Sequence, residues 1–520
     1  MKRMLFPSVI LTLTAVPLIS HAQQASNPDS ALQAIMGSLK GSPLRLEEAR
    51  KHGLTNATAV RKAEADYLAA LGSARREAGA FDPELFFQLN HLDQQLPTAS
   101  FFAGAPVLST QQTTSRSGLR MSLPVGTQLE LSLSTTNLGT NSTFAFLNPE
   151  YDTYGSVTIR QPLLGGFAAS ARKQLTHAER EAEAERARYD QQVVWVSSEV
   201  ERTYWDLYAA ERDFAVQRLT RDRAEAFLSE TEIRFRTGLV GPNQVANART
   251  FLAEQQLLLI DRDEQLSRQS DVLASLIGVR PDSGAGRFIP LDEPPGEFPL
   301  ESEEVLVVKA QESNLDLEAA RRRVDAANAL ASAAGWEALP SVNLVGSLGG
   351  NGLGGGNQPV IFGADTLRIS GAGSFSNAIT QVAKRQFPTW SLGVEVSIPL
   401  GFRSGLGEKD RLEAQVMSAE QDLIEQSRAV ADRVRSAYNE LSHGKDRITA
   451  ARAGVEAAQE QVRVGLIEFH NGRVSAFELV RLGEDFAVAQ QRYSAARVRT
   501  AKAAATLRQL TSGGYSSAPH

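Results

Sequence analysis

Few residues of this chain have the types and spacing that catalysis requires. Gly350, Gly352 and Gly355 match the GxGxxG pattern of nucleotide-binding loops, but no helix opens after them and no acidic residue follows at a suitable distance. The seven histidines form no pair with the spacing of metal ligands, and there is no cysteine. The sequence also contains no nucleophile elbow and no P-loop. It therefore predicts no enzyme, no cofactor and no metal site.

Two glycine turns interrupt long helical segments of the sequence. The first lies in RFRTGLVGPNQVANAR, residues 234–249, and the second in EFHNGRVSAFELVRLG, residues 468–483. Gly238 and Gly472 suit the left-handed position that ends a helix, and Pro242 suits the first position of the next helix. Each turn is thus predicted to reverse one long helix into another.

Four polar side chains follow these turns. Gln244 and Asn247 come after the first turn, and Glu478 and Arg481 occupy the corresponding positions after the second. Glu478 lies three residues after Ser475, a spacing that fits a capping box, so it has a structural interpretation as well as a functional one.

The chain is a tandem repeat. A shift of 234 residues aligns two stretches without a gap and matches Tyr204 with Tyr438 and Gly238 with Gly472. Further matched pairs are Leu207 with Leu441, Phe235 with Phe469, Val245 with Leu479, Leu273 with Leu507 and Leu276 with Leu510. A less similar pair of stretches precedes them. Each half therefore reads as helix, β segment, very long helix, turn and helix.

The helical stretches have the periodicity of packed coiled coils. Apolar residues recur at seven-residue intervals at Val245, Leu252, Leu259, Leu266 and Leu273. The helix predicted from about Ala168 to Arg236 would be roughly 100 Å long. Helices of that length must pack side by side in an extended body.

Between the helices lie segments that alternate between apolar and polar residues. WSLGVEVSI, residues 390–398, is the clearest, and 85–89, 119–133 and 342–348 behave similarly. A soluble sandwich would need a second sheet over the apolar face. Strands that are apolar on one side and polar or small on the other are typical of outer-membrane proteins. One chain has too few of them to close a pore, so several chains must share it.

Stretches rich in Gly, Ser and Asn separate these strands. They cover residues 94–116, 134–152 and 349–386, and the interpretation as membrane strands makes them extracellular loops. Within the first half, residues 119–133 read as an additional hairpin that adds strands or carries the loops further out.

The N-terminus is typical of a secretory signal. Lys2 and Arg3 precede a short apolar stretch, and Ser20-His21-Ala22 forms a small-x-small cleavage pattern, so residues 1–22 are predicted to be removed. The alternative is an N-terminal anchor helix, but Thr, Ser and Pro interrupt the apolar stretch. The net charge of −6 provides no basic surface for nucleic acid. An exported chain without cysteine suits the Gram-negative periplasm or outer membrane.

The combination of these features resembles the TolC-type outer-membrane efflux protein family (outer membrane factors). The resemblance is carried by the two tandem halves, by RQPLLGGF and SIPLGF leading from strand into long helix, by VERTYWDLYAAE with its copy VRSAYNELSHGK, and by the turn in residues 234–249. It covers nearly the whole mature chain.

The resemblance implies an α+β membrane protein that forms a homotrimer. Each copy would give four strands to a shared twelve-stranded outer-membrane β-barrel and its helices to a long periplasmic α-helical barrel. A mixed domain formed by residues 23–43, 280–299 and the tail after 511 would surround the middle of the tube.

The resemblance also implies a function. Members of the family are passive exit ducts of tripartite efflux pumps or type I secretion systems, with a large periplasmic portion below the Gram-negative outer membrane. The implied partners are a periplasmic adaptor (membrane fusion) protein, an inner-membrane RND or ABC transporter and outer-membrane lipid. The cargo would be small molecules or proteins.

For the periplasmic mouth the resemblance implies a gate and a docking surface. The gate positions are Gln244, Asn247, Glu478 and Arg481. Relatives often have an acidic ring there, whereas a three-fold set of Glu478 and Arg481 would close the mouth by charge pairing or select less strongly for cations. The positions that would meet the adaptor are Gly238, Leu239, Val240, Gly472, Arg473 and Val474.

The predicted division of the chain follows the repeat. It comprises a signal peptide (1–22), a first repeat (23–279, with β segment 84–162 and turn 237–242), a linker (280–299), a second repeat (300–511, with β segment 341–399 and turn 471–475) and a tail (512–520). An exported structural coiled coil or adhesin-like surface protein is the main alternative. It explains the helices but not the paired β segments.

Overall fold

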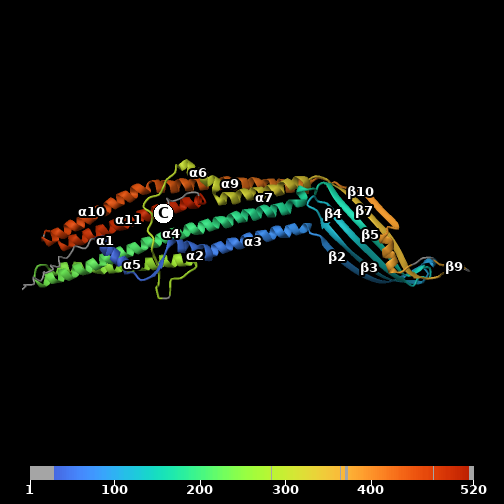
Figure 1. Ribbon diagram of the computed structural model, residues 1–520, viewed down its shortest axis with the longest axis horizontal. Coiled ribbons are helices and arrows are strands. Elements are labelled where there is room, and N and C mark those ends of the chain that lie inside the picture. Colours follow the sequence, from blue (N-terminus) through green and yellow to red (C-terminus); the bar gives the residue numbers. More distant parts are fainter. Residues whose placement is uncertain (1–27, 283, 363–364, 369–372, 472, 514–520) are drawn as a thin grey trace, which may run out of the picture.

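A computed structural model of the chain describes residues 28–282, 284–362, 365–368, 373–471 and 473–513. The predicted signal peptide and Gly472 lie outside the described residues. The molecule is elongated, with long helices over most of its length and a curved sheet at one end (Figure 1).

The elements of the two halves follow one another in a similar order. The first half contains α1 (Pro28–Gly37), β1 (Ser42–Leu44), α2 (Leu46–Asn56), α3 (Thr58–Ala78), η1 (Gly79–Phe81), β2 (Glu84–Pro97), η2 (Phe101–Ala103), β3 (Val107–Ser122), β4 (Gln128–Thr140), β5 (Leu147–Leu164), α4 (Ala169–Arg236) and α5 (Pro242–Ile277). The second contains β6 (Phe288–Pro290), α6 (Glu303–Ser313), α7 (Leu315–Glu337), β7 (Ser341–Asn357), β8 (Val360–Phe362), β9 (Asp365–Leu367), α8 (Phe375–Ala383), β10 (Phe387–Ser397), α9 (Arg403–Ser442), α10 (Gly444–His470) and α11 (Ala476–Leu510).

The predicted long helix of the first half is α4, which runs unbroken for 68 residues. Its counterpart in the second half is divided at His443 into α9 and α10. A Cβ on Gly444 would overlap the side chain of Thr500 in α11, so glycine lets the two helices approach closely at this point.

Helices and strands are arranged in the same lateral order. Next to the sheet, α3 packs on α4, α4 on α7 and α7 on α9, so these four form one layer (Figure 1). Helix α3 leads to β2, β5 leads to α4, α7 leads to β7 and β10 leads to α9. The sheet has the order β10-β7-β5-β4-β3-β2, and all of its neighbouring pairs are antiparallel. The sheet therefore continues the helix layer.

The structure corrects the strand count that the resemblance implied. The sheet has six strands in one chain, not four, because β3 and β4 form a full additional hairpin between β2 and β5. The alternation in residues 119–133 predicted this hairpin, but only its inner part.

The predicted extracellular loops are also shorter than expected. Much of 94–116, 134–152 and 349–386 belongs to strands, since β3 begins at Val107, β4 ends at Thr140 and β7 continues to Asn357. The sequence prediction failed here because Ser, Thr, Asn and Gly outnumber apolar residues in these strand ends, and their backbone pairing does not require an apolar face.

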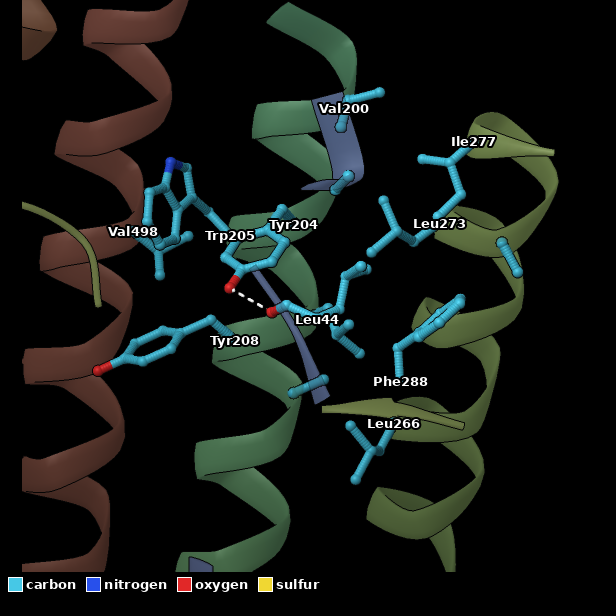
Figure 2. Packing of buried hydrophobic residues seen from close by; sticks show 14 of the residues in the cluster. Leu44, Val200, Tyr204, Trp205, Tyr208, Leu266, Leu273, Ile277, Phe288 and Val498 are labelled. Carbon is cyan, nitrogen blue, oxygen red and sulfur yellow. Dashed lines mark hydrogen bonds between the residues drawn. The ribbon is translucent and has the colours of Figure 1, made fainter. Parts of the chain in front are cut away.

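The largest hydrophobic cluster of the described residues surrounds the middle of α4, where the two halves meet. Tyr204, Leu266 and Leu273 are fully buried there, and Val498 of α11 belongs to the same cluster (Figure 2). Leu207 is also fully buried in it. The Tyr204 hydroxyl donates to the Leu44 carbonyl at 2.9 Å, which ties α4 to β1 (Figure 2). Tyr204 is therefore a packing residue of this core.

A short parallel pair of strands covers this core. Ser42 to Leu44 in β1 pair with Phe288 to Pro290 in β6, two segments that lie far apart in the sequence. The Tyr204 hydroxyl also accepts from the amides of Leu291 and Asp292. Segments before the first repeat helix and between the halves are thus anchored to the middle of α4.

A buried carboxyl in the same region makes stability depend on pH. Burial raises the pKa of Glu211 to about 7 from 4.5, and nearby Arg212 opposes this rise only in part. The folded chain therefore holds this proton more tightly than the unfolded chain. The resulting stabilisation is complete below about pH 4.5 and is lost as the pH rises through about 7.

We therefore expect Glu211→Gln to raise the thermal midpoint at pH 8 by about 2–3 °C and to leave it nearly unchanged at pH 5. Melting curves of the detergent-solubilised protein at both pH values measure this difference. The exposed carboxylate Glu225 on the same helix provides a control, Glu225→Gln. An equal shift at both pH values would contradict the assignment.

Candidate functional site

The first helix turn is built by glycine and proline. Gly238 has a φ of +77°, and the amide of Leu239 donates back to the carbonyl of Arg234 at 2.9 Å, which closes the end of α4. Gly241 caps α5, and Pro242 is its first residue. The conformations predicted for Gly238 and Pro242 are confirmed.

The second turn is capped by a side chain. The Ser475 hydroxyl accepts from the amide of Glu478 at 3.3 Å and caps α11, which begins at Ala476; this is one of the two hydrogen bonds of the predicted capping box. The amide of Arg473 donates to the carbonyl of Glu468 at 2.9 Å. Both turns therefore connect antiparallel helices with backbone groups bonded at the helix ends.

The two hairpin tips are held together by an arginine. The Arg234 guanidinium of α4 lies 4.4 Å from the ring centroid of Phe469 in α10, and it also pairs with Glu230 at 2.7 Å. Phe469 is buried, whereas its repeat partner Phe235 is 44% exposed. Cation–π contact and burial thus fix α4 against the second hairpin near the tips.

The candidate gate residues lie within the first two turns of α5 and α11. All four (Gln244, Asn247, Glu478 and Arg481) are exposed. Within the described residues of one chain, no side-chain hydrogen bond or ion pair joins any of them to another. The chain brings them to the same end of the molecule, but it does not bring them together.

Of the candidate docking residues, Gly472 lies outside the described residues, and the other five lie in the two helix turns at that end. Leu239 is the most exposed of the apolar ones, at 75%, while Val240 and Val474 are half-buried. Gly238 and Arg473 are exposed. An apolar side chain held out by a closed turn is a feature of contact surfaces.

At the opposite end, the sheet has two chemically different faces. Directly paired residues on one face cross all six strands as a single row, here called the apolar row: Leu85, Leu119, Leu131, Val157, Leu348 and Trp390. Their exposed fractions run from 40% for Leu119 to 81% for Leu85. A continuous exposed apolar face of this extent is suited to an apolar environment rather than to water.

The adjacent row of the sheet faces the other way and is polar. It consists of Glu84, Arg120, Glu130, Thr158, Ser347 and Ser391, and is here called the polar row. Arg120 pairs with Glu84 at 2.8 Å, and the Ser347 and Ser391 hydroxyls lie 2.7 Å apart. On the same face, Arg160 pairs with Glu395 at 2.9 Å. The two faces differ in every strand.

Helix α8 is a feature that sequence reasoning missed. It packs on the face of the apolar row, beyond that row, where a Cβ on Gly352 would overlap the carbonyl of Ala378. The Phe375 ring lies 5.6 Å from that of Tyr151 in β5. Alternate glycines at 350, 352 and 354 were the available signal, since glycine at every second strand position indicates close approach of another backbone.

Other site types find no support among the described residues. They contain no group of three or more His, Cys, Asp or Glu side chains that could hold a metal ion. The helices that are described include none that is both long enough and apolar enough to cross a membrane.

Comparison with known proteins identifies relatives of this architecture. The sequence pattern of the family described as outer membrane efflux protein matches residues 51–279 and 306–513, one range in each half. No curated protein matches the chain.

Solved structures share the fold at low sequence identity. The outer-membrane channel OprN is 16% identical with a TM-score of 0.64, and the match covers 90% of each chain. The CmeC outer membrane channel of Campylobacter jejuni is 13% identical with a TM-score of 0.65, covering 90% of this chain and 86% of that one. The outer membrane protein VceC of Vibrio cholerae is 16% identical with a TM-score of 0.62, covering 91% and 97%.

Proposed function

Because the chain belongs to the outer membrane efflux protein family, we propose that it is the passive exit duct of a tripartite efflux pump or a type I secretion system. It is an outer-membrane protein with a large periplasmic helical portion. Cargo would pass from an inner-membrane RND or ABC transporter and a periplasmic adaptor through the duct, and the energy would come from the transporter.

The observation that carries this proposal is the two-faced sheet at the end of the helix layer. Lipid would cover the apolar row, and the polar row would face a water-filled lumen. An exported coiled coil or adhesin has no need of a wall that is apolar on one side and charged on the other. The sheet therefore favours the duct over that alternative.

The duct requires several copies, and we take it to be a homotrimer. In this arrangement the strands of three copies close one barrel, and their helices continue it as an α-helical tube. The chain is then divided into two repeats, 23–279 and 300–511, joined by the linker 280–299. The paired strands β1 and β6 support the assignment of the linker to the middle of the tube.

The two helix turns would form the periplasmic mouth. Gln244, Asn247, Glu478 and Arg481 are proposed as gate residues because all four are exposed within the first two helical turns after the tips. The adaptor would contact the tips themselves. Exposed Leu239, at 75%, is the strongest candidate contact of the described tip residues.

The function can be tested by efflux measurements in the native cell. Deleting the gene should increase retention of fluorescent dyes or remove secreted proteins from the medium, and the wild-type gene should restore both. Leu239→Asp should fail to restore transport although the protein reaches the outer membrane, because a charge at the tip disrupts apolar docking. Thr250→Asp, an exposed position two turns along α5, is the control. Unchanged retention and secretion after deletion would refute the proposal.

The gate assignment predicts an electrical change. Removing the charges of Glu478 and Arg481 together in three copies should raise the open probability in planar bilayers roughly tenfold, since exposed charge pairs contribute about 0.2–1 kcal/mol each. Glu425→Ala, an exposed carboxylate on α9, is the control. If Glu478→Ala with Arg481→Ala leaves opening and ion selectivity at the control level, these residues are not the gate.

A further inference from the structure

The number of strands in one chain carries a consequence for the width of the duct. The hairpin formed by β3 and β4 is paired along its whole length, from Glu84–Arg120 to Pro97–Val107 on one side and from Gln128–Arg160 onward on the other. It lies inside the sheet, between β2 and β5, and not on its surface.

The hairpin also has the same two faces as the rest of the sheet. It contributes Leu119 and Leu131 to the apolar row and Arg120 and Glu130 to the polar row. A hairpin that projected into the medium would need neither an apolar face nor continuity with its neighbours. Its pattern is that of a wall segment.

The two edges of the sheet can pair with each other in a second copy. Strands β2 and β10 each have one strand partner among the described residues, and their outer edges present free backbone groups. Because the sheet has an even number of antiparallel strands, β2 and β10 run in opposite directions. The β10 edge of one copy can therefore join the β2 edge of the next without changing the antiparallel order.

The register of the sheet is that of a closed barrel. The polar row begins at Glu84, the first residue of β2, and reaches β10 at Ser391, six residues before that strand ends at Ser397. This is a stagger of about one residue per strand, which corresponds to a tilt of about 35° for strands about 4.8 Å apart. Barrel strands are tilted by roughly 35–45°.

The same stagger sets the register between copies. If Ser397 meets Glu84 of the next copy, Val394 meets Phe87 and Leu392 meets Leu89. The side chains of both pairs, Val394 with Phe87 and Leu392 with Leu89, lie on the face of the apolar row. The apolar faces of neighbouring copies therefore match across the junction.

The widths of the two layers agree with six strands. Four helices packed 8–10 Å apart occupy roughly 32–40 Å of circumference. Six strands tilted by about 35° occupy roughly 35 Å, whereas four would occupy only about 23 Å. The four-helix layer of α3, α4, α7 and α9 is thus matched by the whole sheet.

From these observations we propose that three copies close an eighteen-stranded barrel, in which the β10 edge of each copy pairs with the β2 edge of the next. This rests on the proposed trimeric duct. Since barrel diameter grows roughly in proportion to strand number, the passage through the membrane is about one and a half times as wide as a twelve-stranded one. Strand numbers of 16–18 leave an aqueous channel.

Cysteine cross-linking tests this arrangement, because the chain has no cysteine of its own. The double variant Val394→Cys with Phe87→Cys should give covalent trimers on oxidation of outer membranes. Leu85→Cys with Val157→Cys should give no disulfide, because these positions are three strands apart, beyond the reach of a disulfide. Glu395→Cys with Phe87→Cys, which places the cysteines on opposite faces, is the negative control.

Each outcome has a distinct meaning. Covalent trimers without a Leu85–Val157 cross-link support eighteen strands. A disulfide within one chain between positions 85 and 157 overturns the proposal, because it requires β2 to pair directly with β5 in a twelve-stranded wall. Trimers by native mass spectrometry without cross-links from position 394 to 85, 87 or 89 overturn the closure. A monomer refutes the trimeric duct itself.

Discussion

Glu201→Ala is expected to cost about 3–5 kcal/mol of stability per copy. The Glu201 carboxylate is buried, with 3% of the residue exposed, and it accepts hydrogen bonds from Arg50 at 2.6 Å and from Arg508 at 2.6 and 2.8 Å. Glu201 belongs to α4, Arg50 to α2 and Arg508 to α11. The cluster therefore joins the first helices of the chain to the last. Removing the carboxylate leaves two half-buried guanidinium groups without their shared partner.

The measurement is the thermal midpoint of the detergent-solubilised protein. For a chain of this length, a loss of this size lowers the midpoint by about 3–5 °C. Glu199→Ala is the matched control, because Glu199 lies on the same helix and pairs with Arg202 nearer the surface. Equal midpoints for the two variants would show that the buried cluster does not hold the halves together.

A charge in the apolar row is expected to prevent assembly into the membrane. Val157 lies in the middle of the sheet, on β5, with 44% of its surface exposed. An arginine on the lipid side near the membrane centre costs about 2–4 kcal/mol, and a trimer carries this cost three times. Val157→Arg should therefore leave little heat-sensitive trimer in the outer-membrane fraction on gels run without boiling.

The neighbouring residue provides the matched control. Thr158 lies in the polar row and is paired with Glu130 of β4. Thr158→Arg introduces the same side chain one position along the strand, on the lumen side, and should give normal amounts of trimer. If both variants assemble equally well, the assignment of the two faces is wrong.

The long helices could be predicted from sequence because their periodicity is local. Leu266 and Leu273 of the seven-residue repeat are fully buried, as the repeat predicts. Leu252 and Leu259 of the same repeat are only half-buried in one chain. The seven-residue repeat shows which face of the helix is apolar. It does not show how many neighbouring helices of the same chain cover that face.

The strands were harder to predict because much of their length is not apolar. The alternation in residues 390–398 and 119–133 marked the strand segments that carry the apolar row. The outer ends of β3, β4 and β7 consist largely of Ser, Thr, Asn and Gly, whose pairing depends on neighbouring strands rather than on a local pattern. The count of six strands therefore emerged only from the structure.

The helix tips were predictable in position but not in chemistry. Gly238, Pro242 and Ser475 determine where the helices turn, through backbone conformation and capping. The roles proposed for Glu478 and Arg481 depend on contacts between copies and with partners. The periodicity of one chain does not encode such contacts.

The proposed duct requires three copies of this chain in the outer membrane. Fractionation of native cells, followed by native mass spectrometry of the detergent-extracted protein, measures both its location and its number of copies. We expect the protein in the outer-membrane fraction, at the mass of three copies of the mature chain. A soluble monomer in the periplasmic fraction would contradict it.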